Sequence, residues 1–112
     1  MKIERPLQLQ ECTYTLGELN INIPKQELQY QNEKIRLCKK EAELLEFLLR
    51  NQGRVVNRLT ILEFIWNHSV QVNTNTLEVH MASLRRKLKK LTQHKVVQTI
   101  YGLGYRLIIP SK

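Results

Sequence analysis

The sequence predicts an α+β fold in which a four-stranded antiparallel sheet precedes three helices and a C-terminal β-hairpin. Three observations predict it. Short β-type segments separated by turn residues fill about 12–37, apolar residues recur at helical spacing between 39 and 91, and two apolar segments around glycines span about 96–109. A chain of 112 residues with no repeat and no linker-like stretch is expected to form one domain, 1–112.

The N-terminal region predicts a meander of short strands. Leu19, Ile21 and Ile23 alternate with asparagines, which turns one face toward a core and the other toward solvent. Glycine, proline and asparagine residues supply the turns between the strands. The expected strands are residues 13–16, 19–23, 28–31 and 34–37.

The apolar period changes at about residue 39, where two helices are expected in succession, at about 39–51 and 58–66. Paired leucines repeat along the first, and Gly53 is expected to act as its C-terminal cap. The side chain of Asn57 is expected to cap the second helix. The apolar stripe expected on this second helix consists of Leu59, Leu62, Ile65 and Trp66.

A third helix, at about 74–91, carries most of the functional information. Asn75 with Glu78 three residues later resembles a capping box. The residues expected to be buried recur at intervals of four, three, four and three, and they are Leu77, Met81, Leu84, Leu88 and Leu91. The face opposite them holds Asn75, Val79, Ala82, Ser83, Arg86 and Lys90.

That opposite face suits contact with a DNA groove. Val79 and Ala82 are small enough to let the helix approach base edges and touch a thymine methyl group, and Ser83 offers a hydroxyl. Arg86 is long enough to reach a phosphate or a guanine edge. The cationic residues beside this face are expected to meet phosphates, and they are Arg85, Lys87 and Lys89.

The final hairpin, at about 96–109, turns at Gly102 and Gly104. Its tip, residues 101–105, is expected to lie along a DNA backbone or in a minor groove. Glycines at a hairpin tip are first of all turn residues, and Tyr105 and Leu107 are equally suited to packing in the core.

Charge is concentrated at one end of the chain. The net charge is +8, and residues 74–112 hold eight basic residues against one acidic residue. Such asymmetry predicts a polyanionic partner, namely double-stranded DNA, approached by that end. The alternative is a solvated cationic surface that only favours solubility.

Several other classes of function are excluded. The apolar runs are too short to span a membrane, and the N-terminus lacks the apolar segment of a signal peptide, so we expect a cytoplasmic protein. Cys12 and Cys38 are expected to be free thiols in a reducing compartment. The sequence shows no nucleophile–base pair, phosphate loop or metal cluster, so neither an enzyme nor a cofactor is expected.

Two helices, a basic helix and a two-stranded ribbon in this order are typical of a winged helix-turn-helix. Residues 37–107 resemble the winged-helix effector domain of the OmpR/PhoB family of two-component response regulators. The segments that carry the resemblance are KKEAELLEFLLRNQGRVVNR, ILEFIW, NTLEVHMASLRRKL and VVQTIYGLGYRL. That family also opens with a four-stranded sheet, so the resemblance spans nearly the whole chain.

The resemblance implies roles for particular residues. Val79 and Ser83 match positions that commonly face bases, and Arg58 and Trp66 match positions that contact phosphates; Trp66 is equally suited to core packing. Positions near the DNA backbone are matched by Thr76, His80 and Arg85, and wing positions by Thr99 and Tyr101. The loop that meets RNA polymerase in several family members corresponds to Asn67, His68, Ser69, Val70, Gln71, Val72 and Asn73.

Four positions depart from the family pattern. Tyr101 stands where many members carry a basic residue that enters the minor groove. Ala82 and Ser83 replace arginines of some members, so direct reading of bases looks sparse and DNA shape is expected to contribute. Cys38 stands where a serine or threonine usually caps the first helix, although Glu41 lies favourably in its first turn.

The leading interpretation is a sequence-specific transcription regulator that binds duplex DNA as a dimer or a tandem pair on two half-sites. The alternative is a winged-helix module that contacts RNA polymerase or another regulator and reads little DNA directly. In the family a receiver domain controlled by aspartyl phosphorylation normally precedes the effector domain. The sequence leaves open whether this chain is such an effector domain or a protein that stands alone.

Overall fold

The computed structural model describes residues 13–66 and 75–108. Its first sheet is a meander in the order β1-β2-β3-β4, and each neighbouring pair is antiparallel. The predicted meander is therefore confirmed, and its buried face carries Leu19, Ile21 and Leu28. The strands are β1 (Thr13–Leu16), β2 (Leu19–Asn22), β3 (Glu27–Tyr30) and β4 (Glu33–Arg36). The last two begin one residue earlier than expected from the sequence.

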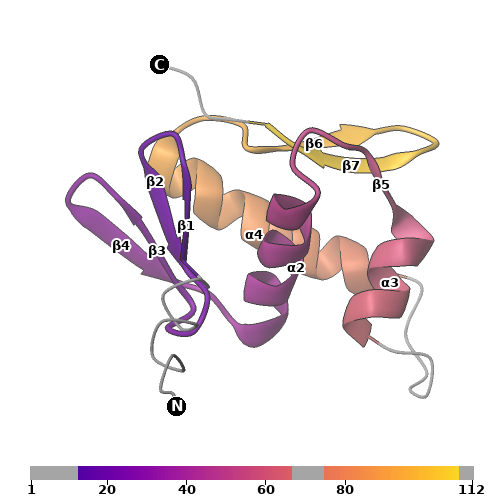
Figure 1. Cartoon of the computed structure of the whole chain (residues 1–112), viewed down its shortest axis with the longest axis horizontal. Helices are drawn as coiled ribbons and strands as arrows, with labels where there is room; N and C mark the ends of the chain where they lie inside the picture. The colour runs from indigo at the N-terminus through magenta and orange to yellow at the C-terminus, as the bar shows by residue number, and fades with distance from the viewer. Residues whose placement is uncertain (1–12, 67–74, 109–112) are drawn as a thin grey trace, which may run out of the picture.

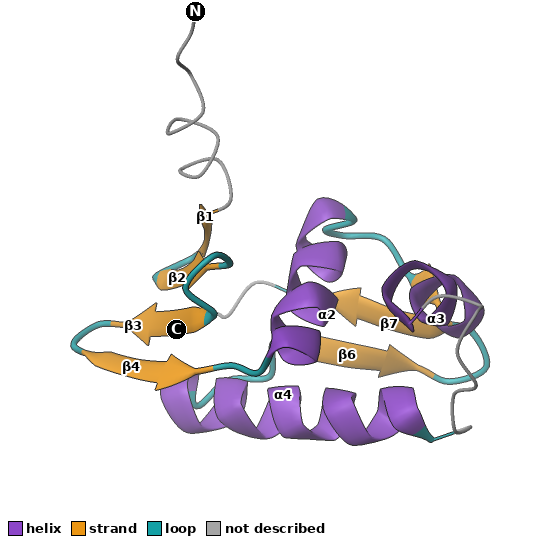
Figure 2. Cartoon of the chain, turned by 90° about the horizontal axis from the view of Figure 1, so that it is seen from below, coloured by secondary structure: helices purple, strands orange, loops and turns teal. Residues whose placement is uncertain are grey.

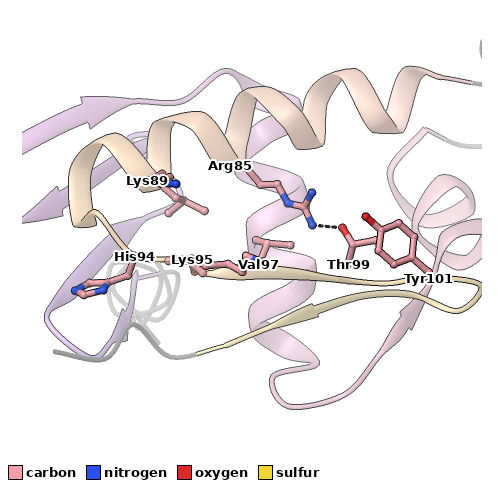
Figure 3. Close-up of a pocket in the computed structure, with 9 residues that line it drawn as sticks. Arg85, Lys89, His94, Lys95, Val97, Thr99 and Tyr101 are labelled. Atoms are coloured by element: carbon pink, nitrogen blue, oxygen red, sulfur yellow. Dashed lines mark hydrogen bonds between the residues drawn. The ribbon is translucent and has the colours of Figure 1, made fainter.

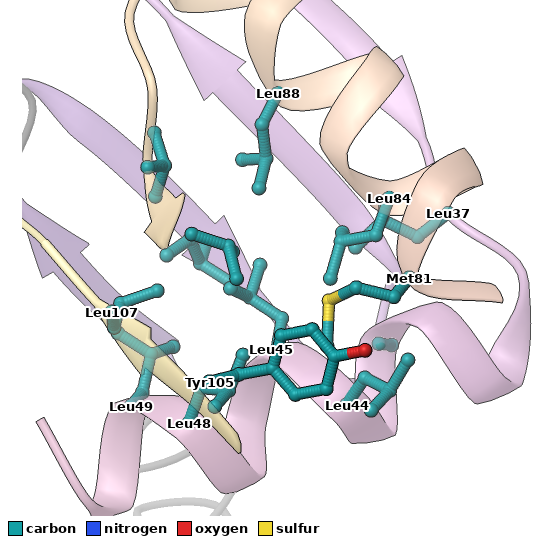
Figure 4. Packing of buried hydrophobic residues seen from close by; sticks show 14 of the residues in the cluster. Leu37, Leu44, Leu45, Leu48, Leu49, Met81, Leu84, Leu88, Tyr105 and Leu107 are labelled. Carbon is teal, nitrogen blue, oxygen red and sulfur yellow. The ribbon is translucent and has the colours of Figure 1, made fainter. Parts of the chain in front are cut away.

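The helices are α2 (Lys39–Arg50), α3 (Arg58–Trp66) and α4 (Thr76–Thr92), within one or two residues of the predicted bounds. The longest, α4, runs from the side of α3 to the four-stranded sheet and packs against α2 (Figures 1 and 2). Its predicted buried face is confirmed, because Leu77, Met81, Leu84, Leu88 and Leu91 are all buried. These residues meet the leucines of α2 in the main core (Figure 4).

The C-terminal hairpin packs onto this core as expected. It consists of β6 (Val97–Ile100) and β7 (Gly104–Leu107), and Tyr105 and Leu107 are both buried beside α2 (Figure 4). The sequence did not reveal a third strand, β5 (Val56–Asn57), which pairs with β7 to give the order β5-β7-β6. Two residues are too few to show a period, so this strand has no signal in the sequence.

Three local expectations need correction or confirmation. Leu59 is 64 % exposed, and Ile61 is the fully buried residue of α3. The prediction failed because apolar residues are spread around most of the circumference of α3, so spacing alone does not define its inner face. The C-terminal cap of α2 is Asn51 rather than Gly53, and the Asn51 side chain donates to the Phe47 carbonyl at 2.8 Å. The cap by Asn57 is confirmed, since its Oδ1 accepts from the Leu59 N–H at 2.7 Å.

The pairing of β5 with β7 requires glycine at position 104. A Cβ atom built on Gly104 would lie 1.9 Å from the Val56 carbonyl oxygen, whereas one on Gly102 would have nothing within 4 Å. We expect Gly104→Ala to lower the free energy of unfolding by about 2–3 kcal/mol through forced separation of the two strands. Urea denaturation measures this loss. Gly102→Ala is the matched control, since it carries only the cost of a positive φ, about 1 kcal/mol; equal losses would contradict the steric explanation.

Candidate nucleic-acid interface

One face of α4 is exposed along its whole length. The exposed residues recur at helical spacing opposite the buried leucines, and they are Asn75, Val79, Ala82, Arg86, Lys89 and Lys90. Val79 is 58 % exposed, although it is apolar. The first half of this face is small and uncharged, and the second half is cationic. Such a surface fits into the major groove with its small residues near bases and its cations near phosphates.

Ser83 lies beside this exposed face rather than on it. It is half-buried, and its hydroxyl donates to Glu41 at the start of α2. The Lys87 ammonium, one turn further along α4, donates to the same carboxylate at 2.7 Å. Both side chains were expected to face DNA, and both are instead directed toward α2. The physical reason is that Glu41 is buried and requires partners for its charge.

Glu41 thus connects the start of α2 to the middle of α4. Its carboxylate also accepts from the Cys38 N–H at 2.9 Å, which completes the first turn of α2 in spite of the poor capping residue. Burial acts to raise the pKa of the Glu41 carboxyl, but the hydrogen bonds from Lys87, Ser83 and the Cys38 N–H outweigh burial and lower it. The carboxylate is therefore ionised and fixes the position of α4.

Arg85 joins α4 to the wing. Its guanidinium donates to the Thr99 hydroxyl on β6 and lies 5.6 Å from the ring centroid of Tyr105 on β7. Burial raises the pKa of the Tyr105 phenol, so the ring under the guanidinium is neutral. Two residues expected near the DNA backbone, Arg85 and Thr99, are therefore brought together by the fold.

A cationic cavity of about 240 Å³ separates the second half of α4 from β6 (Figure 3). Arg85 and Lys89 line it from the helix, and Thr99 and Tyr101 line it from the wing. His94 and Lys95 also line it, although the sequence analysis did not single them out. The sequence could have revealed them, because both lie in the short connection between the basic helix and the wing. Residues in such a connection are necessarily close to both elements.

Arg58, expected to contact phosphate, is held by an acidic side chain of α4. Its Nε and Nη2 atoms donate to the two oxygens of Glu78 at 2.6 and 3.2 Å. This pair lowers the pKa of the Glu78 carboxyl and raises that of the Arg58 guanidinium. The predicted capping box at the start of α4 is wrong, because Glu78 pairs with Arg58 and the Asn75 side chain makes no cap hydrogen bond.

Trp66 and His80 pack against each other at the end of α3, with ring centroids 5.3 Å apart. The Nδ1 atom of His80 lies 3.0 Å from the Thr76 carbonyl, which is hydrogen-bond distance. The Lys40 ammonium lies 5.5 Å from the centre of the Trp66 ring and donates to the Ile65 carbonyl. Trp66 and His80 are both half-buried, so packing is one role of each.

The remaining candidate residues fall into two groups. Tyr101, at the wing tip, is 91 % exposed. The loop Asn67–Asn73, together with Cys12, lies outside the described residues. Within the described ranges no group of three metal-binding side chains comes together, and no helix is long and apolar enough to cross a membrane.

Comparison with known families gives a match over most of the chain. The family described as "Transcriptional regulatory protein, C terminal" matches residues 32–107. The transcriptional regulatory protein CusR of Escherichia coli K12 is 32 % identical over 101 residues, which are 90 % of this chain and 44 % of CusR. The alkaline phosphatase synthesis transcriptional regulatory protein PhoP of Bacillus subtilis is 35 % identical over 102 residues, 90 % of this chain and 42 % of PhoP. The chain thus spans less than half the length of these relatives.

Solved structures give the same fold. The DNA-binding domain of CpxR from Escherichia coli superposes with a TM-score of 0.72 at 25 % sequence identity. The superposition covers 88 % of this chain and 98 % of that domain. The four-stranded sheet, the three helices and the wing therefore correspond to one complete domain of that structure.

Proposed function

Because the chain belongs to the family of C-terminal domains of transcriptional regulatory proteins, of the OmpR/PhoB type, we propose that it binds duplex DNA sequence-specifically and regulates transcription. It would act as the effector domain of a two-component response regulator. The observation that carries the proposal is the exposed face of α4, where small residues precede Arg86, Lys89 and Lys90, and where the partly exposed Glu78 beside it is paired with Arg58.

The arrangement of α4 and the wing supports a two-groove mode of binding. With α4 in the major groove, the wing beside it would reach the adjacent minor groove. The DNA strand that separates the two grooves would then lie across the junction of α4 and β6, which Arg85 and Thr99 hold together. The cationic cavity lies at that place, where Arg85, Lys89 and Lys95 would neutralise its phosphates.

Direct base reading would rest on few side chains. Val79 and Ala82 offer apolar contact with thymine methyl groups, and Arg86 can reach a guanine edge. Ser83 is engaged by Glu41, which leaves it less available to a base. Sequence-dependent DNA shape would therefore supply part of the specificity.

The phosphate role of the exposed cations is tested by the salt dependence of binding. We expect Arg86→Ala and Lys89→Ala each to reduce the slope of log K against log salt by about 0.9, the value for one phosphate contact. Fluorescence anisotropy with a 20-bp duplex over a salt series measures the slope. Lys34→Ala, on the exposed side of β4, is the charge-matched control and should leave the slope unchanged. Equal slopes for all three variants would contradict the proposed interface.

RNA polymerase is a proposed second partner, on the side of the molecule where α3 ends. Phe64 is 71 % exposed, and its ring centroid lies 5.1 Å from that of Phe47 on α2. Phe64 is thus an exposed aromatic side chain near the end of α3, packed on the half-buried Phe47, and it supports a protein contact on this side. A dimer or tandem pair on DNA is also proposed from the family resemblance, and analytical ultracentrifugation of the complex on a two-half-site duplex tests it.

A further inference from the structure

The tip of the wing presents large apolar side chains to solvent. Contact with phosphates would make no use of such side chains. Tyr101 is 91 % exposed and Leu103 is 61 % exposed, with Gly102 between them. The hairpin carries this tip out beyond the helical core, on the side of α3 (Figure 1). Exposed apolar side chains on a projecting element suggest a contact that has not yet been made in the isolated chain.

The tip is held in shape by its own turn and by β5. The Leu103 N–H donates to the Ile100 carbonyl at 2.9 Å, which closes the turn. Gly104 follows directly and lies against the Val56 carbonyl, where no larger residue fits. Tyr101 and Leu103 are therefore displayed on a fixed turn, and little conformational entropy is lost when they are inserted into a partner.

The surroundings of the tip favour a polyanionic partner over a protein. A cavity of about 330 Å³ beside the tip is lined by uncharged residues apart from Arg58, whose guanidinium is paired with Glu78. The neighbouring cavity between α4 and β6 adds Arg85, Lys89 and Lys95. No carboxylate lines either cavity. An apolar tip beside cations matches the minor groove, where phosphates flank the sugars and the base edges.

We propose that Leu103 is an apolar wedge that enters the minor groove and partly unstacks one base step, while Tyr101 packs on the neighbouring sugars. The inference rests on the proposed function, because α4 in the major groove is what brings the wing to the minor groove. Leucine is among the residues that minor-groove proteins insert between base pairs. Unstacking is easiest at TA and CA/TG steps, so insertion of Leu103 would add a preference for sites that contain such a step. This preference would supply specificity at the wing, where Tyr101 provides no positive charge for the minor groove.

The test uses duplexes selected from a random library by the unaltered chain, each with 2-aminopurine in place of one adenine. This base becomes more fluorescent when it is unstacked. The variants are Leu103→Ala, which removes the wedge, and Leu103→Met, which keeps a long apolar side chain at the tip. Phe64→Ala is the control, because it removes an apolar side chain that is also exposed but lies on α3, away from the wing. Anisotropy on the same duplexes gives each affinity.

We expect the unaltered chain to raise the 2-aminopurine fluorescence at only one base step of the half-site. Leu103→Ala should abolish that rise and weaken binding by ~10-fold, the scale of one buried leucine side chain. Leu103→Met should keep most of the rise, and Phe64→Ala all of it. Sequence-specific binding without a rise at any position, or a rise that survives in Leu103→Ala, would overturn the wedge and leave the proposed function standing. Failure of the library to enrich any sequence would overturn both.

Discussion

Ala82→Glu is expected to abolish DNA binding, with an affinity loss of more than ~100-fold. Ala82 lies in the middle of the exposed face of α4, between Val79 and Arg86. A carboxylate there would enter a groove walled by phosphates, and a like-charge contact of this kind costs several kcal/mol, or about tenfold in affinity for each 1.4 kcal/mol. Glutamate is a good helix former, so α4 itself should not be disturbed.

The structure makes Ala82 a better position for this test than Ser83. A glutamate at position 83 would lie against the buried Glu41 carboxylate, and lost binding would then report a destabilised fold. Anisotropy of Ala82→Glu, of the neutral Ala82→Gln and of Thr15→Glu on the exposed side of β1 separates groove contact from net charge. If Ala82→Glu bound no more weakly than Thr15→Glu, α4 would not be the groove-facing element.

Glu41→Ala is expected to lower the free energy of unfolding by about 2–3 kcal/mol. Removal of one partner of a buried ion pair costs about 3–5 kcal/mol. The expected loss is smaller here because the Lys87 side chain is 30 % exposed and water partly replaces its partner. The change also removes the acceptor for the Cys38 N–H and for Ser83, which lie at the start of α2 and in the middle of α4.

Urea denaturation as a function of pH tests the role of Glu41. Its pKa is lowered in the folded chain, so its contribution should be complete above the ordinary value of 4.5 and be lost as the pH falls through the folded pKa. Glu41→Gln should therefore show a shallower loss of stability below pH 4.5 than the unaltered chain. Glu43→Ala, which breaks the partly exposed pair with Lys40, should cost about 0.5 kcal/mol. Equal losses for Glu41→Ala and Glu43→Ala would contradict the account.

The sequence predicted most of the fold because the core elements carry strong periods. Leu77, Met81, Leu84 and Leu88 recur at helical spacing, and all are buried. Where the period is weak, the prediction failed. Apolar residues are spread around most of α3, which led to Leu59 in place of Ile61, and β5 is too short to show alternation. Both errors concern elements whose position is set by tertiary packing.

The candidate site was less predictable than the fold. Helical spacing placed Val79, Ala82 and Arg86 on the exposed face. It did not reveal that Glu41, about forty residues earlier, draws Ser83 and Lys87 toward α2, since an ion pair between distant segments has no local signal. The contact of Arg85 with Thr99 arises in the same way, because the wing folds back along α4 only in the tertiary structure.

Whether this chain reads duplex DNA is tested most directly by its affinity for an enriched sequence relative to a scrambled duplex of the same length. Fluorescence anisotropy at physiological salt measures both. The account predicts a preference of 10³ or more, the scale of specific binders, with an affinity that falls steeply as salt rises. Equal, weak and salt-insensitive affinities for the two duplexes would contradict it and favour a protein partner instead.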